Sequence, residues 1–161
     1  MGGNDIPRKQ PNSQNCYVCG LENEYGLQLV FFDNGVDEVW CDYAIPEHYQ
    51  GYPGVAHGGV VAAILDEICG RATMITDLSH FMMTAKIEVK YRCPVPLNVK
   101  MRVVGRVDRR RGRLAQARGE LRLPDGVLAA EATLILADLQ DNLRGQISLD
   151  ELGWRVYDDG D

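Results

Sequence analysis

Alternation of apolar and polar side chains predicts two strands early in the chain. Apolar residues occupy every second position through residues 27–32, and again through residues 39–45. Asp33-Asn34-Gly35, which follows the first of these segments, supplies turn chemistry. The two segments are therefore expected to form a β-hairpin.

The segment HGGVVAAILDEICGRATMI is apolar over a longer run than a buried strand needs. Residues 59–65 carry no polar side chain, and apolar residues continue to Ile75. This length predicts one helix from about Gly58 to Ile75. Its apolar residues lie nearly all round the helix axis, so the helix is expected to be buried on nearly every side.

The second half of the chain alternates with a period of two and predicts four more strands. These strands are expected at residues 84–93, 99–107, 115–123 and 128–136. A basic turn, Arg109-Arg110-Arg111-Gly112-Arg113, follows the second of them. Ser148-Leu149-Asp150-Glu151 has the pattern of a helix start, which fits a short C-terminal helix.

The element order is therefore β-β-α-β-β-β-β, an α+β arrangement. Hairpin connections predict an antiparallel sheet. One sheet cannot enclose a helix completely, so a second subunit is expected to cover the rest of it. Residues 1–15 are polar and are expected to be flexible, which leaves one domain over residues 16–140 and an extension over residues 141–161.

Composition and charge exclude several classes of protein. The chain has 161 residues, of which 45% are hydrophobic and 25% charged, as in a single globular domain. A formal net charge of −6 argues against nucleic-acid binding. No segment reaches the ~18 apolar residues of a membrane span. The first 15 residues lack the apolar core of a signal peptide, so a cytoplasmic protein with reduced thiols is expected.

Two of the five cysteines, Cys16 and Cys19, form a C-x-x-C pair. This pair supplies two of the four ligands of a structural zinc site, but no second close pair and no nearby histidine supply the others. The βαβ pattern that accompanies a redox C-x-x-C is also missing. We therefore expect no metal and no cofactor, with a zinc site and a redox pair as less favoured alternatives.

Asp66 is the first candidate for chemistry, because it follows seven residues that have no polar side chain. A carboxylate in apolar surroundings is costly unless it is hydrogen-bonded or paired. A surface-facing position at the helix edge, or a structural hydrogen bond to a neighbouring strand, is the alternative explanation. The neighbouring Glu67 is interpreted as structural, because Arg71 lies four residues further along the helix.

The helix begins with His57-Gly58-Gly59. Two glycines let a ligand approach the backbone closely, and the first-turn N–H groups have no acceptor within the helix. Together with the helix dipole, these groups could polarise a carbonyl or hold a developing oxyanion. The alternative is a glycine-eased helix start in which His57 is satisfied locally.

The spacing of Gly59 and Asp66 restricts how the two could cooperate. They are seven residues apart, within about 20° of the same helical face and about 10.5 Å apart along the axis. One reacting carbon cannot lie about 3 Å from both groups of the same helix. If both serve one site, the Asp66 side chain must come from the other subunit of an antiparallel helix pair.

Three segments carry a resemblance to a known family. PEHYQGYPGVA followed by HGGVVAAILDE, and then MTAKIEVKYRCPVP, resembles the hotdog-fold acyl-CoA thioesterases of the PaaI-like and 4-hydroxybenzoyl-CoA thioesterase superfamily. CYVCGLENEYGLQLVFF resembles the opening of one branch of that group, and the likeness runs from about Cys16 to Leu139. The resemblance implies a curved antiparallel sheet wrapped around one long central helix, in a homodimer or homotetramer that hydrolyses acyl-CoA without a metal.

The resemblance also implies roles for individual residues. Asp66 takes the position of the family's general base or nucleophile, and the N–H of Gly59 that of the group polarising the thioester carbonyl. Thr84 corresponds to a residue that helps orient the water, and His57 to the histidine at the helix start. Some members carry an Asn six residues before that histidine, where this sequence has Gly51.

The basic turn is either a solvated hairpin or a seat for the coenzyme A phosphates, which arginine forks suit. The candidate substrate-binding residues are the four arginines of this turn, together with Gly58 at the start of the helix. The arginines are Arg109, Arg110, Arg111 and Arg113. The alternative to a thioesterase is a non-catalytic hotdog dimer that binds acyl-CoA as a sensor or carrier. A hotdog dehydratase is less favoured, because the Asp/His arrangement of those enzymes is not evident.

Overall fold

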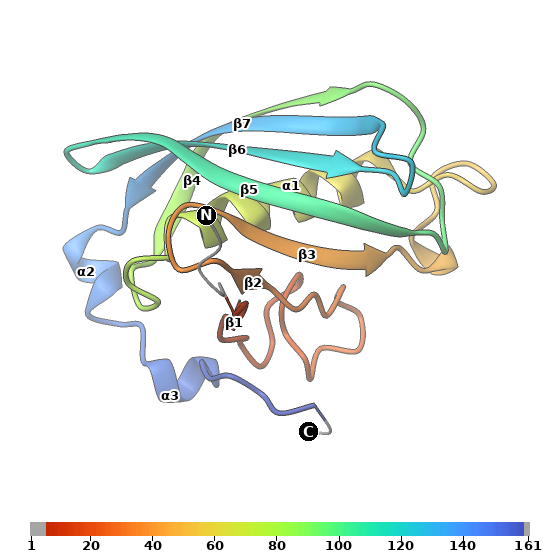
Figure 1. Cartoon of the computed structure of the whole chain (residues 1–161). Coiled ribbons are helices and arrows are strands. Elements are labelled where there is room, and N and C mark those ends of the chain that lie inside the picture. Colours follow the sequence, from red (N-terminus) through yellow and green to blue (C-terminus); the bar gives the residue numbers. More distant parts are fainter. Residues whose placement is uncertain (1–5, 160–161) are drawn as a thin grey trace.

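An antiparallel sheet curves around one long helix in this computed structural model, which describes residues 6–159 (Figure 1). Within those residues the sheet has seven strands, in the order β1-β2-β3-β5-β6-β7-β4. The strands are β1 (Arg8–Lys9), β2 (Phe32–Asp33), β3 (Val39–Ala44), β4 (Met82–Tyr91), β5 (Lys100–Arg111), β6 (Leu114–Arg122) and β7 (Leu128–Asp138). The helices are α1 (Gly58–Ala72), α2 (Asp141–Arg144) and α3 (Leu149–Leu152), with a 3₁₀ turn η1 at Glu47–Tyr49.

The predicted α+β class and hotdog arrangement are confirmed, with β1 added before the predicted order. The strand predicted over residues 27–32 is wrong in its extent, because only Phe32 of that segment belongs to β2. The Leu27 and Leu29 amides instead donate to the carbonyls of Tyr17 and Val18.

Helix α1 ends three residues earlier than predicted, because Thr73 caps it and its hydroxyl donates to the Gly70 carbonyl at 2.7 Å. The predicted basic turn is wrong in its extent. Arg109–Arg111 belong to strand β5, and the turn consists of Gly112 and Arg113.

Helix α1 packs into the concave face of the sheet through one apolar face. The residues of this face are at most 1% exposed and include Val61, Ile64, Leu65, Ile68 and Cys69. Gly105 on β5 permits the contact, since a Cβ there would lie 2.5 Å from the carbonyl oxygen of Ile68. The helix backbone therefore lies close against the sheet.

The prediction that residues 1–15 are flexible is wrong for residues 6–15, whereas residues 1–5 lie outside the described residues. Gln10 and Asn12 are fully buried. The Asn12 amide donates to two backbone carbonyls at 2.8 Å each, and the Gln10 amide donates to Asp33 at 2.8 Å. Polar composition suggested exposure, but the NH₂ groups of both side chains donate hydrogen bonds to acceptors inside the fold.

The N-terminal segment also covers a side of α1 that the sequence assigned to a second subunit. Arg71 on α1 is 1% exposed and donates from Nη1 to the carbonyl oxygen of Pro11. Its guanidinium lies 4.6 Å from the ring centre of Phe31 and 4.8 Å from that of Trp154. A stripe of α1 stays at least partly open, and its residues are Gly58, Gly59, Ala62, Ala63, Asp66, Glu67 and Gly70.

The C-terminal segment closes against the N-terminal one, and a β-bridge joins Asn12 to Arg155. Ser148 accepts a hydrogen bond from the Glu151 amide at 3.3 Å, so it caps α3 as its sequence pattern suggested. All five cysteines are free thiols. Among the described residues, no helix has both the length and the apolar character that crossing a membrane requires.

Candidate active site

Asp66 and Thr84 meet between the open stripe of α1 and the edge strand β4. The Thr84 hydroxyl donates to Oδ1 of Asp66 at 2.6 Å. The register of β4 against β7 shifts between Thr84 and Lys86, and such an irregularity redirects side chains locally. The structure therefore brings together two candidate residues that lie 18 positions apart in the sequence.

The Asp66–Thr84 pair borders a small pocket of about 100 Å³. The wall is mixed, with Gly70, Met74, Met82 and Leu136 beside the charged groups of Glu67 and Arg71. No other hydrogen bond within residues 6–159 is recorded for the Asp66 carboxylate. Its second oxygen, Oδ2, can therefore accept a proton or attack an electrophile. The alternative expectation for Asp66, a hydrogen bond to a neighbouring strand, is therefore met by Thr84. This bond uses only Oδ1, so Oδ2 can still react.

At the start of α1, His57 holds the amide that was expected to bind an oxyanion. Its Nδ1 accepts a hydrogen bond from the Gly59 N–H at 2.9 Å, which makes His57 the N-cap of the helix. Both residues are exposed. A substrate carbonyl would have to replace the imidazole of His57 as acceptor of this N–H.

Gly58 lines a different pocket, of about 370 Å³, between the start of α1 and the end of β4. The Tyr91 hydroxyl donates to the Gly58 carbonyl at 2.6 Å, which ties β4 to the first turn of the helix. This pocket and the one beside Asp66 have no lining residue in common. Within one chain, Gly58 and Asp66 therefore line separate pockets.

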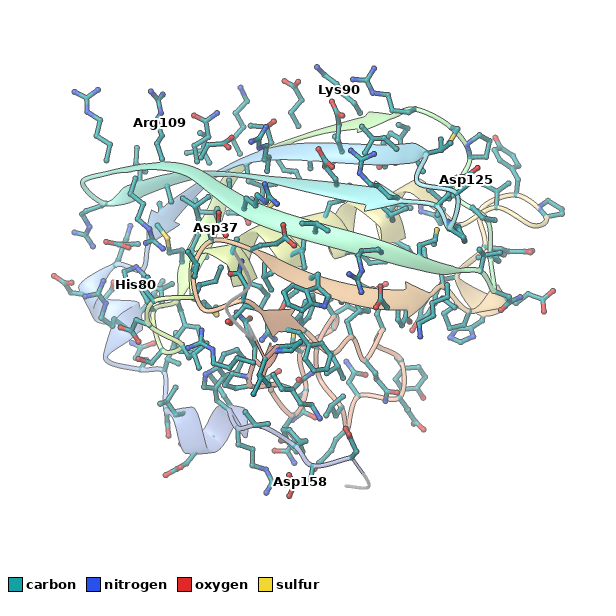
Figure 2. All side chains as sticks on the ribbon, viewed as in Figure 1. Asp37, His80, Lys90, Arg109, Asp125 and Asp158 are labelled. Atoms are coloured by element: carbon teal, nitrogen blue, oxygen red, sulfur yellow. The ribbon has the colours of Figure 1, made fainter. Side chains whose placement is uncertain are left out.

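The four candidate arginines divide into two pairs. Arg110 donates to the Thr73 carbonyl at the end of α1, and Arg113 donates to the Leu139 carbonyl at 3.1 Å, so both hold the fold. Arg109 and Arg111 are exposed. Figure 2 shows Arg109 projecting outward from the sheet near its β5–β6 turn. All four arginines are exposed, but within residues 6–159 only Arg109 and Arg111 among them make no side-chain hydrogen bond or ion pair.

Sequence reasoning missed a cluster formed by Cys16, Cys19 and Glu67. The two Sγ atoms and a Glu67 carboxylate oxygen all lie within 4.8 Å of one another. Glu67 also forms the predicted pair with Arg71, at 3.0 Å. Burial raises the pKa of the Glu67 carboxyl, and Arg71 opposes this shift. No sequence signal linked Glu67 to the cysteines, because only the fold brings α1 beside the N-terminal segment.

The fold and the site together define a class. A curved antiparallel sheet around one long helix is the hotdog fold, and here the helix presents a carboxylate to a hydroxyl on the edge strand. Residues 53–130 match the family model of the thioesterase superfamily. This match covers just under half of the chain and agrees with the family that its sequence motifs resemble.

Curated relatives include acyl-coenzyme A thioesterase THEM4 from two vertebrates. The chain is 32% identical to the Rattus norvegicus protein over 82 residues, which cover 50% of this chain and 34% of that protein. It is 27% identical to the Xenopus laevis protein over 121 residues, which cover 74% of this chain and 52% of that protein. The chain thus spans about half the length, or less, of these relatives.

Solved structures agree on the fold. A crystal structure of a thioesterase superfamily protein superposes with a TM-score of 0.70 at 29% identity, covering 76% of this chain and 60% of that one. A Streptococcus mutans protein bound to acetyl CoA gives a TM-score of 0.59 at 19% identity, covering 63% of this chain and 81% of that one. At this lower identity the likeness concerns the fold alone.

Proposed function

We propose that the protein is an acyl-CoA thioesterase that hydrolyses an acyl-CoA thioester to a free acid and coenzyme A. The observation that carries the proposal is the Asp66–Thr84 hydrogen bond at a pocket beside α1. The match to the thioesterase superfamily model and the likeness to acyl-CoA thioesterases support it. The proposed chemistry uses groups of the protein and water.

In the proposed reaction, Asp66 acts on the thioester carbonyl in one of two ways. As a general base it takes a proton from water while the water oxygen bonds to the carbonyl carbon. As a nucleophile it attacks that carbon itself, and water then hydrolyses the resulting anhydride. In both routes the C–S bond breaks, and the leaving thiolate of coenzyme A takes up a proton. Thr84 keeps the carboxylate oriented through its 2.6 Å hydrogen bond and helps orient the water.

The amide of Gly59 is proposed to hold the oxyanion that develops on the carbonyl oxygen. Because Gly59 and Asp66 lie about 10.5 Å apart along α1, the amide would come from one chain and the carboxylate from another. The open stripe of α1 and the exposed edge strand β4 support a homodimer of this kind, with a dimer of dimers as a further step. In such a dimer, antiparallel α1 helices would bring the two kinds of pocket together.

The proposed partners are an acyl-CoA substrate and further copies of this chain. The net charge of −6 disfavours nucleic acid as a partner. We also propose a cytosolic location, because a reducing compartment suits five free thiols.

A second candidate function is non-catalytic binding of acyl-CoA as a sensor or carrier. The hydrogen bond from Gly59 to His57 favours it, since that amide already has an acceptor. Release of thiol from a panel of short-chain, long-chain and aromatic acyl-CoA substrates separates the two functions. We expect catalytic release with at least one substrate, with kcat of about 1 s⁻¹ or more. Stoichiometric binding by calorimetry without thiol release from any substrate would instead identify a carrier.

Arg109 and Arg111, whose guanidinium groups make no hydrogen bond or ion pair in the described part of the chain, are expected to contact the phosphates of coenzyme A. Replacing both Arg109 and Arg111 with Ala should raise KM for acyl-CoA by about tenfold, since two charge-assisted contacts are lost. KM for an acyl-pantetheine thioester, which lacks the nucleotide, should not change. Steady-state kinetics on both substrates measures this difference.

Arg102→Ala is the matched control for the arginine experiment. Arg102 is also an exposed arginine of β5, but it pairs with Asp42 at 2.7 Å on the same face of the sheet. Its loss should leave both KM values unchanged. If the double variant and the control behave alike on the two substrates, the end of the β5–β6 hairpin is only a solvated turn.

A further inference from the structure

The C-x-x-C segment is folded into a turn that holds the two thiols together. The Gly20 amide donates to the Cys16 carbonyl at 2.8 Å, and the Val18 amide donates to the Cys16 Sγ at 3.4 Å. A Cβ at position 20 would lie 2.4 Å from the Cys16 carbonyl oxygen, so this turn requires glycine. Backbone N–H groups directed at a sulfur stabilise its thiolate form, which is the form that binds metal ions.

Helix α1 supplies a third donor to the same place. A Glu67 carboxylate oxygen and the Sγ atoms of Cys16 and Cys19 lie within 4.8 Å of one another, as ligands around a single ion would. Cys19 is 2% exposed, and the Glu67 side chain is 22% exposed. Two thiolates and a carboxylate suit zinc, and three protein donors leave one tetrahedral position for water.

The charges around the cluster also suit a divalent cation. In their deprotonated forms, Cys16, Cys19 and Glu67 carry three negative charges, and the buried Arg71 beside them carries one positive charge. A dication brings the sum to zero, whereas without one the same partly buried groups keep an uncompensated negative charge or hold protons.

Neighbouring side chains fix the donors in position. The Arg71 Nε donates to Glu67 at 3.0 Å, and the Ser13 hydroxyl lies 3.4 Å from the Cys19 Sγ. Arg71 is in turn held by the Pro11 carbonyl and by the rings of Phe31 and Trp154. Such supporting contacts are typical of metal sites, because they hold the donors in place before the ion binds.

We propose that Cys16, Cys19 and Glu67 form a binding site for a zinc ion that links the N-terminal segment to helix α1. The proposal does not depend on the thioesterase activity, and no step of that reaction uses the ion. Because Glu67 directly follows Asp66, the ion would fix the helix turn that presents the carboxylate to Thr84. The sequence-based expectation of no metal rested on two donors, and the fold adds a third.

The test measures metal content of the full chain. The protein is purified under reducing conditions from cells grown with added zinc, and bound zinc is counted by mass spectrometry. We expect about one zinc ion per chain. Cys16→Ser and Cys19→Ser should each lower the bound zinc by about tenfold or more, and Glu67→Gln should weaken zinc affinity by at least about tenfold. Cys93→Ser, which changes a half-buried cysteine outside the cluster, should retain the full amount.

Cobalt titration of the reduced, metal-free wild-type chain tests the site without any substitution, so the result does not depend on whether a variant folds. Thiolate coordination should produce a sulfur-to-cobalt charge-transfer band that saturates at about one equivalent, and zinc should abolish it. A reduced wild-type chain that binds neither zinc nor cobalt would overturn the proposal, as would a thiol pair that only oxidises to a disulfide. Unchanged zinc affinity in a folded Glu67→Gln protein would exclude the carboxylate as a ligand and so overturn the three-donor site.

Discussion

Asp66→Asn is expected to reduce kcat for the best acyl-CoA substrate by about 10²–10⁴-fold, because loss of a general base typically costs that much. The amide keeps the size of the side chain and can still accept the hydrogen bond from Thr84. It can neither take a proton from water nor attack a carbonyl carbon. Folding and substrate binding should therefore persist, which circular dichroism and calorimetric titration measure alongside the rate.

The matched control for Asp66→Asn is Asp125→Asn. Asp125 lies in the exposed turn between β6 and β7, far along the chain from α1 (Figure 2). It undergoes the same chemical change, and its activity should stay at the wild-type level. If Asp66→Asn also retains activity within a few-fold of wild type, the Asp66–Thr84 hydrogen bond is structural and the proposed mechanism is wrong.

Two inactive variants are expected to restore activity when they share a dimer. One carries Asp66→Asn, and the other carries Gly59→Val, whose side chain blocks approach to the amide. A Cβ at position 59 would already lie 3.1 Å from the His57 Nδ1, so the larger valine side chain occupies the space beside the first turn of α1. In a heterodimer, one of the two sites contains both substitutions, and the other site has the wild-type Gly59 amide and the wild-type Asp66 carboxylate. Activity should return to about half the wild-type value per heterodimer, whereas each homodimer stays inactive.

This complementation depends on both parents being folded dimers. Each variant is therefore checked by thermal unfolding and by its mass in solution before the subunits are mixed. Differently tagged chains allow the heterodimer to be isolated and assayed alone. An inactive heterodimer made from two well-folded parents would mean that each site lies within one chain, contrary to the geometry argued from Gly59 and Asp66.

The order of elements could be predicted because the core obeys simple periodicity. Alternation placed β3 to β7 within a few residues, and an unbroken apolar run placed α1. The N-terminal segment could not be predicted in this way, because Gln10 and Asn12 are buried through hydrogen bonds to groups distant in the sequence. The polarity of a residue can be read from the sequence, but whether the fold supplies it with a buried hydrogen-bond partner cannot.

The candidate site was predictable only in part. The motif resemblance named Asp66 and Thr84, and the structure places them in contact, while their catalytic roles stay predictions. The hydrogen bond between His57 and Gly59 is a local rotamer choice that no periodicity encodes. The four arginines could not be told apart in the sequence. In the fold, Arg110 and Arg113 donate to the backbone carbonyls that follow α1 and β7.

The position of β4 in the sheet has a consequence for how the protein forms during synthesis. β4 is made directly after α1, but within the sheet it pairs with β7, whose last residue is Asp138. As the chain leaves the ribosome, β5 and β6 can join as a hairpin at once, while β4 must wait for the final strand. Until then the apolar surface of α1 that packs against β7 and β4 stays in water, and we expect the nascent chain to be most prone to aggregation during this interval.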